Sequence, residues 1–305
     1  MGTIQGLWPL RTQSRDDRDP AVPTADGVID GSRDWRDIDV TTTSAMWTEE
    51  MVELAGASVQ MVKGGTGDPL LVLHDEMGHP GWLRFHEALS QEFTLYIPSH
   101  PGFGDSPYLD WIMNMRDMAG WYLEALDDLA IGRVKMMGFS FGGWLAAEMA
   151  TMSPGRFEKL ILVDAMGVQP PVGEIYDMFL VVAKEFITAG FLDPEGTAEF
   201  ERICPEEPTP EQVEYWEVAR EQACRIGWKP YMYYPALPHL LNRLKSLPTM
   251  VVWGSDDPIV PLSAGQLYRD SIPGSRLEVL NDCGHRPEVE RHEAFVKVVR
   301  EFLSG

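Results

Sequence analysis

The sequence is poor in cysteine. Its 305 residues contain three, Cys204, Cys224 and Cys283. An odd number of cysteines in so long a chain does not make a disulfide framework, and none of them stands in the C-x-x-C spacing typical of a zinc site. A reducing, cytoplasmic location is therefore the simplest interpretation.

Positive charge and long apolar runs are also scarce. Asp and Glu outnumber Lys and Arg by 47 to 25, which gives a formal net charge of −22. A surface of that charge repels phosphate backbones and anionic headgroups, so we expect neither a nucleic-acid partner nor a membrane. No run of about 18 apolar residues is present, and the amino terminus lacks the basic-then-apolar layout of a signal peptide, so we expect a soluble, unprocessed protein.

From about residue 46, continuous apolar segments alternate with amphipathic ones. The apolar segments PLLVLHD, FTLYIPS, RVKMMGFS and FEKLILVDA are typical of buried strands. This alternation predicts an α/β fold with a mostly parallel sheet covered by helices on both faces. The alternation of apolar and amphipathic segments stops after residue 168 and resumes near residue 240. We therefore predict a polar amino-terminal arm over 1–45, a core formed by 46–168 and 240–305, and a helical insertion over 169–239.

One short motif stands between a predicted strand and a predicted helix. Gly138-Phe139-Ser140-Phe141-Gly142 fits G-x-S-x-G, with RVKMM before it and GGWLAAEMA after it. In so tight a turn, side chains at the two glycine positions would collide, while the central residue is held strained and clear of the sheet. The helix start also supplies backbone N–H groups where an oxyanion would form. The motif therefore predicts that Ser140 is a nucleophile.

A serine nucleophile needs a histidine base that a carboxylate orients, and both follow Ser140 in the chain. VVWGSDDPIVP offers Asp256 and Asp257 after one predicted strand, and VLNDCGHRPEVERHEAF offers His285 after the next. An open α/β sheet assembles its ligand site at the carboxyl ends of its strands. We therefore predict a triad of Ser140, His285 and an aspartate.

Taken together, these segments resemble the α/β-hydrolase superfamily, in its cap-bearing, esterase-like serine hydrolase branch. The resemblance runs from about residue 50 to residue 303 and rests on LVLHDEMG, PSHPGFGDSP, MGFSFGGW, WGSDDPIVP and CGHRPEVER. It implies an α/β-hydrolase fold with a helical cap. It also selects Asp257 over Asp256, because the triad acid usually stands three residues after the glycine of the W-G motif. Some relatives keep the acid after the preceding strand, where this chain has Asp164, so Asp164 stays an alternative.

The resemblance also implies two backbone N–H donors for the oxyanion. Phe141 supplies the first, and the second belongs to the loop after LLVLH. By position Glu76 is that donor, with Met77 as the alternative. Relatives usually have His-Gly at this point, whereas this chain has His74-Asp75, which leaves the path of the loop open.

Serine at the centre of the G-x-S-x-G motif argues against the haloalkane dehalogenase and epoxide hydrolase branches, which use aspartate as the nucleophile. We expect a serine esterase that cleaves a small-molecule carboxylic ester through an acyl-enzyme. One alternative is a carbon–carbon bond hydrolase of ring-fission products, although such enzymes typically carry tryptophan where this chain has Arg286. Another is a non-catalytic small-ligand receptor on the same fold.

No cofactor or metal is expected. HDEMGH resembles a zinc motif, but His74 and His79 are five apart and Pro80 follows, so the two imidazoles do not share a helical face. No pattern indicates the oligomeric state, and an oligomer stays open.

Overall fold

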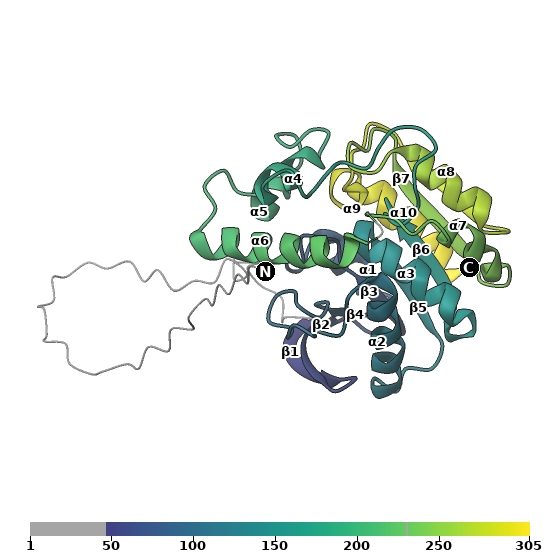
Figure 1. Cartoon of the computed structure of the whole chain (residues 1–305). Coiled ribbons are helices and arrows are strands. Elements are labelled where there is room, and N and C mark those ends of the chain that lie inside the picture. The colour runs from purple at the N-terminus through teal and green to yellow at the C-terminus, as the bar shows by residue number, and fades with distance from the viewer. Residues whose placement is uncertain (1–46, 230) are drawn as a thin grey trace, which may run out of the picture. The chain divides into compact units, whose positions relative to one another are not determined.

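The computed structural model describes residues 47–229 and 231–305, and the predicted arm over 1–45 lies outside them. Figure 1 shows strands and helices alternating along the described chain. None of the described helices is both long enough and apolar enough to cross a membrane.

Eight strands form one sheet in the order β1-β2-β4-β3-β5-β6-β7-β8. The β1–β2 and β2–β4 pairs are antiparallel, and the pairs from β4 through to β8 are parallel. All residues of β5 and β7 are buried, as continuous apolar strands between two helical layers should be. The predicted fold class is confirmed. The strands are β1 (Trp47–Leu54), β2 (Ala57–Gly64), β3 (Asp68–Leu73), β4 (Phe93–Pro98), β5 (Val134–Phe139), β6 (Phe157–Val163), β7 (Thr249–Gly254) and β8 (Arg276–Leu280).

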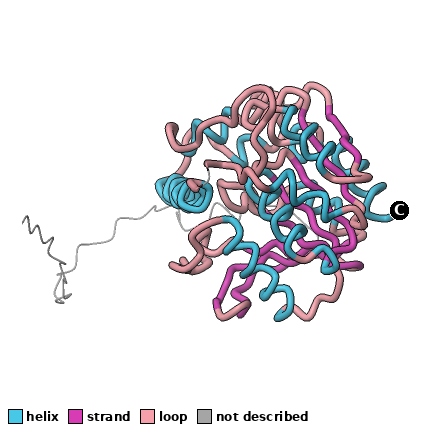
Figure 2. Tube along the Cα trace, turned by 45° about the vertical axis from the view of Figure 1, so that its right-hand side comes forward, coloured by secondary structure: helices cyan, strands magenta, loops and turns pink. Residues whose placement is uncertain are grey.

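Helices cover both faces of this sheet (Figure 2). The ring of Phe139, at the end of β5, packs on Phe85 of α1 and Phe295 of α10, with centroids 5.4 and 6.0 Å away. The preceding residue, Gly138, faces Gly142 of α3. Because neighbouring strand residues point to opposite faces, α3 lies across the sheet from α1 and α10. The core helices are α1 (Arg84–Leu89), α2 (Met115–Asp128), α3 (Ser140–Met152), the 3-10 helix η2 (Pro154–Arg156), α8 (Leu262–Ser271), α9 (Pro287–Glu290) and α10 (His292–Ser304).

The segment between β6 and β7 is helical, and α4, α5 and α6 lie together in Figure 1. The long helix α6 begins with a capped first turn. The Thr209 hydroxyl accepts a hydrogen bond from the Gln212 N–H at 3.3 Å, and Pro210 is the first helical residue. The helices here are α4 (Ala183–Ala189), α5 (Phe200–Ile203), α6 (Pro210–Gly227), α7 (Leu237–Leu240) and the 3-10 helix η3 (Leu241–Leu244).

This helical segment contacts the loops that follow the strands. The Tyr215 hydroxyl of α6 accepts a hydrogen bond from the His79 N–H at 2.9 Å, in the loop after β3. The Gly190 carbonyl, just after α4, accepts one from the His285 N–H at 2.7 Å, in the loop after β8. The segment therefore lies against the carboxyl edge of the sheet, where the predicted site residues stand.

Candidate active site

Ser140 occupies a strained turn between β5 and α3. Its φ of +47° is a left-handed conformation that residues other than glycine rarely adopt. A Cβ at Gly138 would lie 2.2 Å from the Gly142 carbonyl oxygen, and a Cβ at Gly142 would lie 2.3 Å from the His74 carbonyl oxygen. Both glycines of G-x-S-x-G are therefore required by backbone packing: Gly138 lets β5 meet α3 closely, and Gly142 lets α3 meet the end of β3.

His285 and Asp257 meet in buried surroundings after β8 and β7. Nδ1 of His285 lies 2.8 Å from Oδ2 of Asp257. The other oxygen of Asp257 accepts hydrogen bonds from the N–H groups of Ile259 and Val260, at 2.8 and 2.9 Å. Both carboxylate oxygens of Asp257 are thus hydrogen-bonded, and the carboxylate fixes the orientation of the imidazole. Nε2, on the opposite side of the ring, does not contact Asp257 and is available for proton transfer.

Ser140 and His285 each have a buried polar atom that lacks a partner of ordinary geometry within the described part of the chain. Among the described residues, neither Ser140 Oγ nor His285 Nε2 has a hydrogen-bond partner of ordinary geometry. Leaving buried polar atoms unpaired costs free energy, so such atoms call for an explanation. A catalytic site would explain both, because a bound substrate would interact with Ser140 Oγ and His285 Nε2.

The charge state of His285 follows from its neighbours. Burial by itself lowers the pKa of His285, but the charge and hydrogen bond of Asp257, followed by the charge of Glu76, outweigh it. The net result is a pKa raised above the ordinary value of a histidine. The protonated imidazolium, which forms when the ring accepts a proton, is therefore stabilised here.

The other two candidate aspartates are placed differently. Asp164, after β6, accepts a hydrogen bond from the Gly254 N–H at 2.9 Å, and burial followed by the charge of Asp257 raises the pKa of Asp164 well above its usual range. Asp256 is exposed and accepts a hydrogen bond from the Ser255 hydroxyl. Asp257 is thus the aspartate of the three that holds His285.

Asp164, Asp257 and His285 also form a group that could hold a cation. Each offers one ligand atom, and these atoms lie within 4.8 Å of one another. However, Asp257 already bonds two backbone N–H groups and the imidazole, and His285 uses Nδ1 for that contact. The arrangement fits a proton-handling pair better than a metal site.

The side chain of Glu76 lies in the site as well. Its Oε2 accepts a hydrogen bond from the Phe141 N–H at 3.3 Å, and its carboxyl also accepts one from its own backbone N–H. Oε1 lies 4.0 Å from His285 Nε2. Both N–H groups expected to hold an oxyanion therefore point at this carboxyl group. The N–H of Met77, the alternative donor, is engaged by Asp75 Oδ1 at 2.8 Å.

Sequence reasoning considered the Glu76 backbone and missed its side chain. The signal was the departure from His-Gly to His74-Asp75-Glu76, because an acidic residue beside a predicted oxyanion donor needs a reason. The neighbouring Asp75 does have a partner, since its carboxylate lies 2.9 Å from an Arg286 nitrogen. Arg286 also bonds Glu288 at 2.7 Å, so two carboxylates balance its charge.

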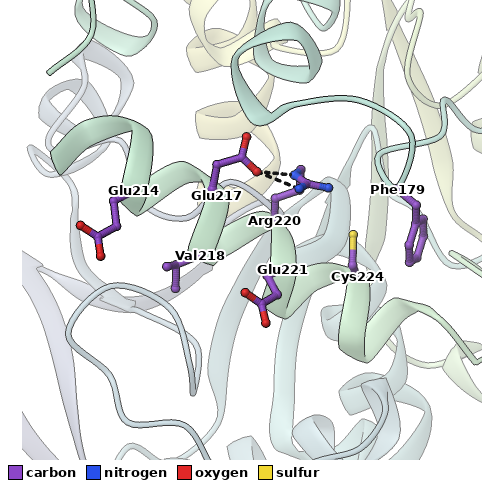
Figure 3. A pocket seen from close by; sticks show the side chains of 7 residues that line it. All are labelled: Phe179, Glu214, Glu217, Val218, Arg220, Glu221 and Cys224. Atoms are coloured by element: carbon purple, nitrogen blue, oxygen red, sulfur yellow. Dashed lines mark hydrogen bonds and ion pairs between the residues drawn. The ribbon is translucent and has the colours of Figure 1, made fainter. Parts of the chain in front are cut away.

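A surface groove of about 530 Å³ lies elsewhere, along α6 (Figure 3). Within it Arg220 pairs with Glu217 at 2.8 Å. Neither Ser140 nor His285 lines this groove, so it is no candidate for the reacting centre. Its lining residues are Phe179, Glu214, Glu217, Val218, Arg220, Glu221 and Cys224.

Known proteins resemble this chain in sequence and fold. A family model described as the Alpha/beta hydrolase family matches residues 70–298. A 2-hydroxy-6-oxononadienedioate/2-hydroxy-6-oxononatrienedioate hydrolase of Burkholderia vietnamiensis is 28% identical over 263 residues, which cover 78% of this chain and 88% of that protein.

Two solved structures extend the likeness. A bacterial membrane phospholipase A superposes with a TM-score of 0.73 at 23% identity, covering 86% of this chain and 87% of that one. A thermophilic esterase from Thermogutta terrifontis has a TM-score of 0.59 at 25% identity, covering 85% and 98%.

Proposed function

The chain belongs to the alpha/beta hydrolase family, and on that premise we propose that it hydrolyses carboxylic esters through an acyl-enzyme on Ser140. The observation that carries the proposal is the contact of 2.8 Å between His285 Nδ1 and Asp257 Oδ2, and the strained G-x-S-x-G turn at Ser140 supports it. These are the parts that activate a serine hydroxyl for attack on a carbonyl carbon.

The proposed reaction begins with attack by Ser140 Oγ on the ester carbonyl, while His285 Nε2 takes the hydroxyl proton. The carbonyl oxygen becomes an oxyanion, which the backbone N–H groups of Phe141 and Glu76 stabilise. His285 then passes its proton to the leaving alcohol. Water activated by His285 hydrolyses the acyl-enzyme, and Asp257 stabilises the imidazolium in both halves of the cycle.

The helical segment over 169–239 acts as a cap in this proposal. Its contact with the His285 loop, through the Gly190 carbonyl, supports that role. The substrate is a small-molecule ester that binds between cap and core, and the reaction needs no metal or cofactor. A cytoplasmic location remains part of the proposal.

Carbon–carbon bond hydrolysis is the second candidate. The Burkholderia relative is named for an oxo-dienedioate substrate, and its match covers most of both chains. Arg286 counts against this candidate, because ring-fission hydrolases typically carry tryptophan directly after the histidine. Its guanidinium is paired with Asp75 and Glu288.

The test compares p-nitrophenyl esters from acetate to decanoate with a 2-hydroxy-6-oxo-dienoate. We expect kcat/KM to be higher for the esters, with an optimum chain length that reports the size of the acyl pocket. Faster turnover of the dienoate would favour the second candidate. Tight binding without turnover of either substrate class would point to a ligand receptor.

A further inference from the structure

The Glu76 carboxyl group lies where the oxyanion of the proposed reaction would form. It accepts hydrogen bonds from the N–H groups of Phe141 and of Glu76 itself, and it lies 4.0 Å from His285 Nε2. A carboxylate resembles the acid product of ester hydrolysis in shape and charge. The Glu76 side chain therefore occupies the two N–H donors that a substrate carbonyl oxygen would need.

The substrate carbonyl cannot share these donors with the side chain. Glu76 is 1% exposed, and Phe141 is fully buried, so the donors are closed off by the carboxyl group that they bind. Oxyanion donors act only when they lie at hydrogen-bond distance from the reacting oxygen. For the reaction to start, the carboxyl group must move aside and the carbonyl oxygen must take its place.

The groups that face Glu76 leave no spare positive charge for the displaced carboxyl group. Asp75 on the same loop is negative, and Arg286 after β8 is already bonded by Asp75 and Glu288. His285, when protonated, is balanced by Asp257. Burial and then the charge of Asp75 raise the pKa of Glu76, while the charge of His285, the nearby Ser140 hydroxyl and the backbone N–H of Glu76 act in the opposite direction. The effect of burial belongs to the position at the two donors, so the carboxyl group carries its negative charge more readily once it has left that position.

We propose that Glu76 is a specificity-determining gate: the substrate carbonyl displaces its carboxyl group from the two N–H donors, and the displaced carboxyl group then selects against acyl groups that carry a negative charge. This inference rests on the proposed ester hydrolysis. An acyl chain that ends in a carboxylate brings another anion beside Glu76 and Asp75. Like charges a few ångströms apart repel appreciably even in a partly screened site, so we expect the anionic ester to react about 10-fold more slowly or worse.

A matched ester pair tests the selection. p-Nitrophenyl hexanoate and the mono-p-nitrophenyl ester of adipic acid have acyl chains of the same carbon number and differ in one carboxylate, which stands too far from the ester carbonyl to cleave it rapidly by itself. Wild type should prefer the hexanoate by about 10-fold or more in kcat/KM. Glu76→Gln keeps the size of the side chain and removes its charge, so it should cut that preference by at least about 5-fold. Glu92→Gln, at an exposed glutamate before β4, is the control and should change nothing. An unchanged preference in Glu76→Gln would overturn the selection.

A fluorophosphonate tests the displacement without any ester. Its phosphorus bonds to Ser140 Oγ, fluoride leaves, the hydroxyl proton passes to His285, and the phosphoryl oxygen needs the same two N–H donors. Glu76→Ala removes the carboxyl group that competes for these donors, so labelling should be about 10-fold faster than in wild type. A factor of about 10 corresponds to the free energy of one hydrogen bond that no longer has to be broken. Slower labelling would overturn the gate while leaving the nucleophile intact.

The two arms separate the gate from the proposed function. Ser140-dependent labelling without turnover of any ester would refute the esterase, and the labelling rates would still decide the gate. No labelling of wild type or Glu76→Ala would refute both. Thermal unfolding of each variant identifies one that does not fold, in which case the Glu76→Gln ester pair decides.

Discussion

At the scale of single residues, Asp257 is the carboxylate on which the His285 imidazole depends. We predict that Asp257→Asn lowers kcat by about 10⁴-fold, because an amide stabilises the wrong tautomer and cannot balance the imidazolium. Asp164→Asn should cost much less, since the raised pKa of Asp164 already favours a neutral side chain. Asp256→Asn, at an exposed position, is the control. If Asp164→Asn cost as much as Asp257→Asn under the same ester assay, the acid role would have to be reassigned.

The pKa of His285 sets the pH dependence. His285 must be neutral to act as a base, so kcat/KM should rise with pH and reach half its maximum above the ordinary histidine value of about 6.5. A raised pKa also means that His285 stabilises the fold fully below about pH 6.5, and that this contribution is lost as pH rises through the folded-state pKa.

The matching pH profile of Asp257→Asn is the control for this assignment. Without Asp257 the effect of burial dominates, so the half-maximum should move to lower pH. A midpoint that stays in place would mean that another group is titrating. Circular dichroism at each pH separates unfolding from titration.

Single residues were predictable to different degrees. Ser140 and His285 follow from a motif and from positions after strands, which are local features of the sequence. Spacing alone does not separate Asp257 from Asp164, because both stand at strand ends; the distance to the imidazole does. The departure from His-Gly marks the loop that carries Glu76, but the direction of its side chain was not predictable, since a backbone donor role does not say where the side chain points.

At the scale of elements, the close approach of α3 to the end of β3 depends on a glycine, Gly142. We predict that Gly142→Ala lowers the free energy of unfolding by about 1–3 kcal/mol, because its Cβ would meet backbone oxygens of Leu73 and His74 at 2.4 and 2.3 Å. Backbone atoms cannot move aside as a flexible side chain can. Gly155→Ala in η2 meets nothing within 4 Å and is the control. Equal melting temperatures for the two variants would contradict the packing account.

The elements themselves were largely predictable, because buried strands show as apolar runs and helices as periodic ones. The ends were less so. The helix predicted from Gly142 begins two residues earlier, at Ser140. The sequence predicts a last helix from about residue 290 to 302, and α10 covers His292–Ser304. It starts after Arg291, whose φ and ψ of −124° and 42° are not helical, and the short α9 precedes it.

At the scale of the whole molecule, the helical segment over 169–239 contacts the loops that carry the candidate site. Its helical character is visible in the sequence, as in the capped start of α6. Its position is not, because that depends on contacts between residues far apart in the chain. The hydrogen bonds of Gly190 to His285 and of Tyr215 to His79 span such distances. They bring the segment to the loops that carry the candidate site.

The central claim is that Ser140 attacks the substrate, and the most direct measurement is p-nitrophenyl butyrate hydrolysis by wild type and Ser140→Ala side by side. We predict a loss in kcat on the order of 10⁶, with both proteins unfolding at similar temperatures. A variant that keeps half of the wild-type rate would contradict the account, because the ester would then be cleaved without Ser140.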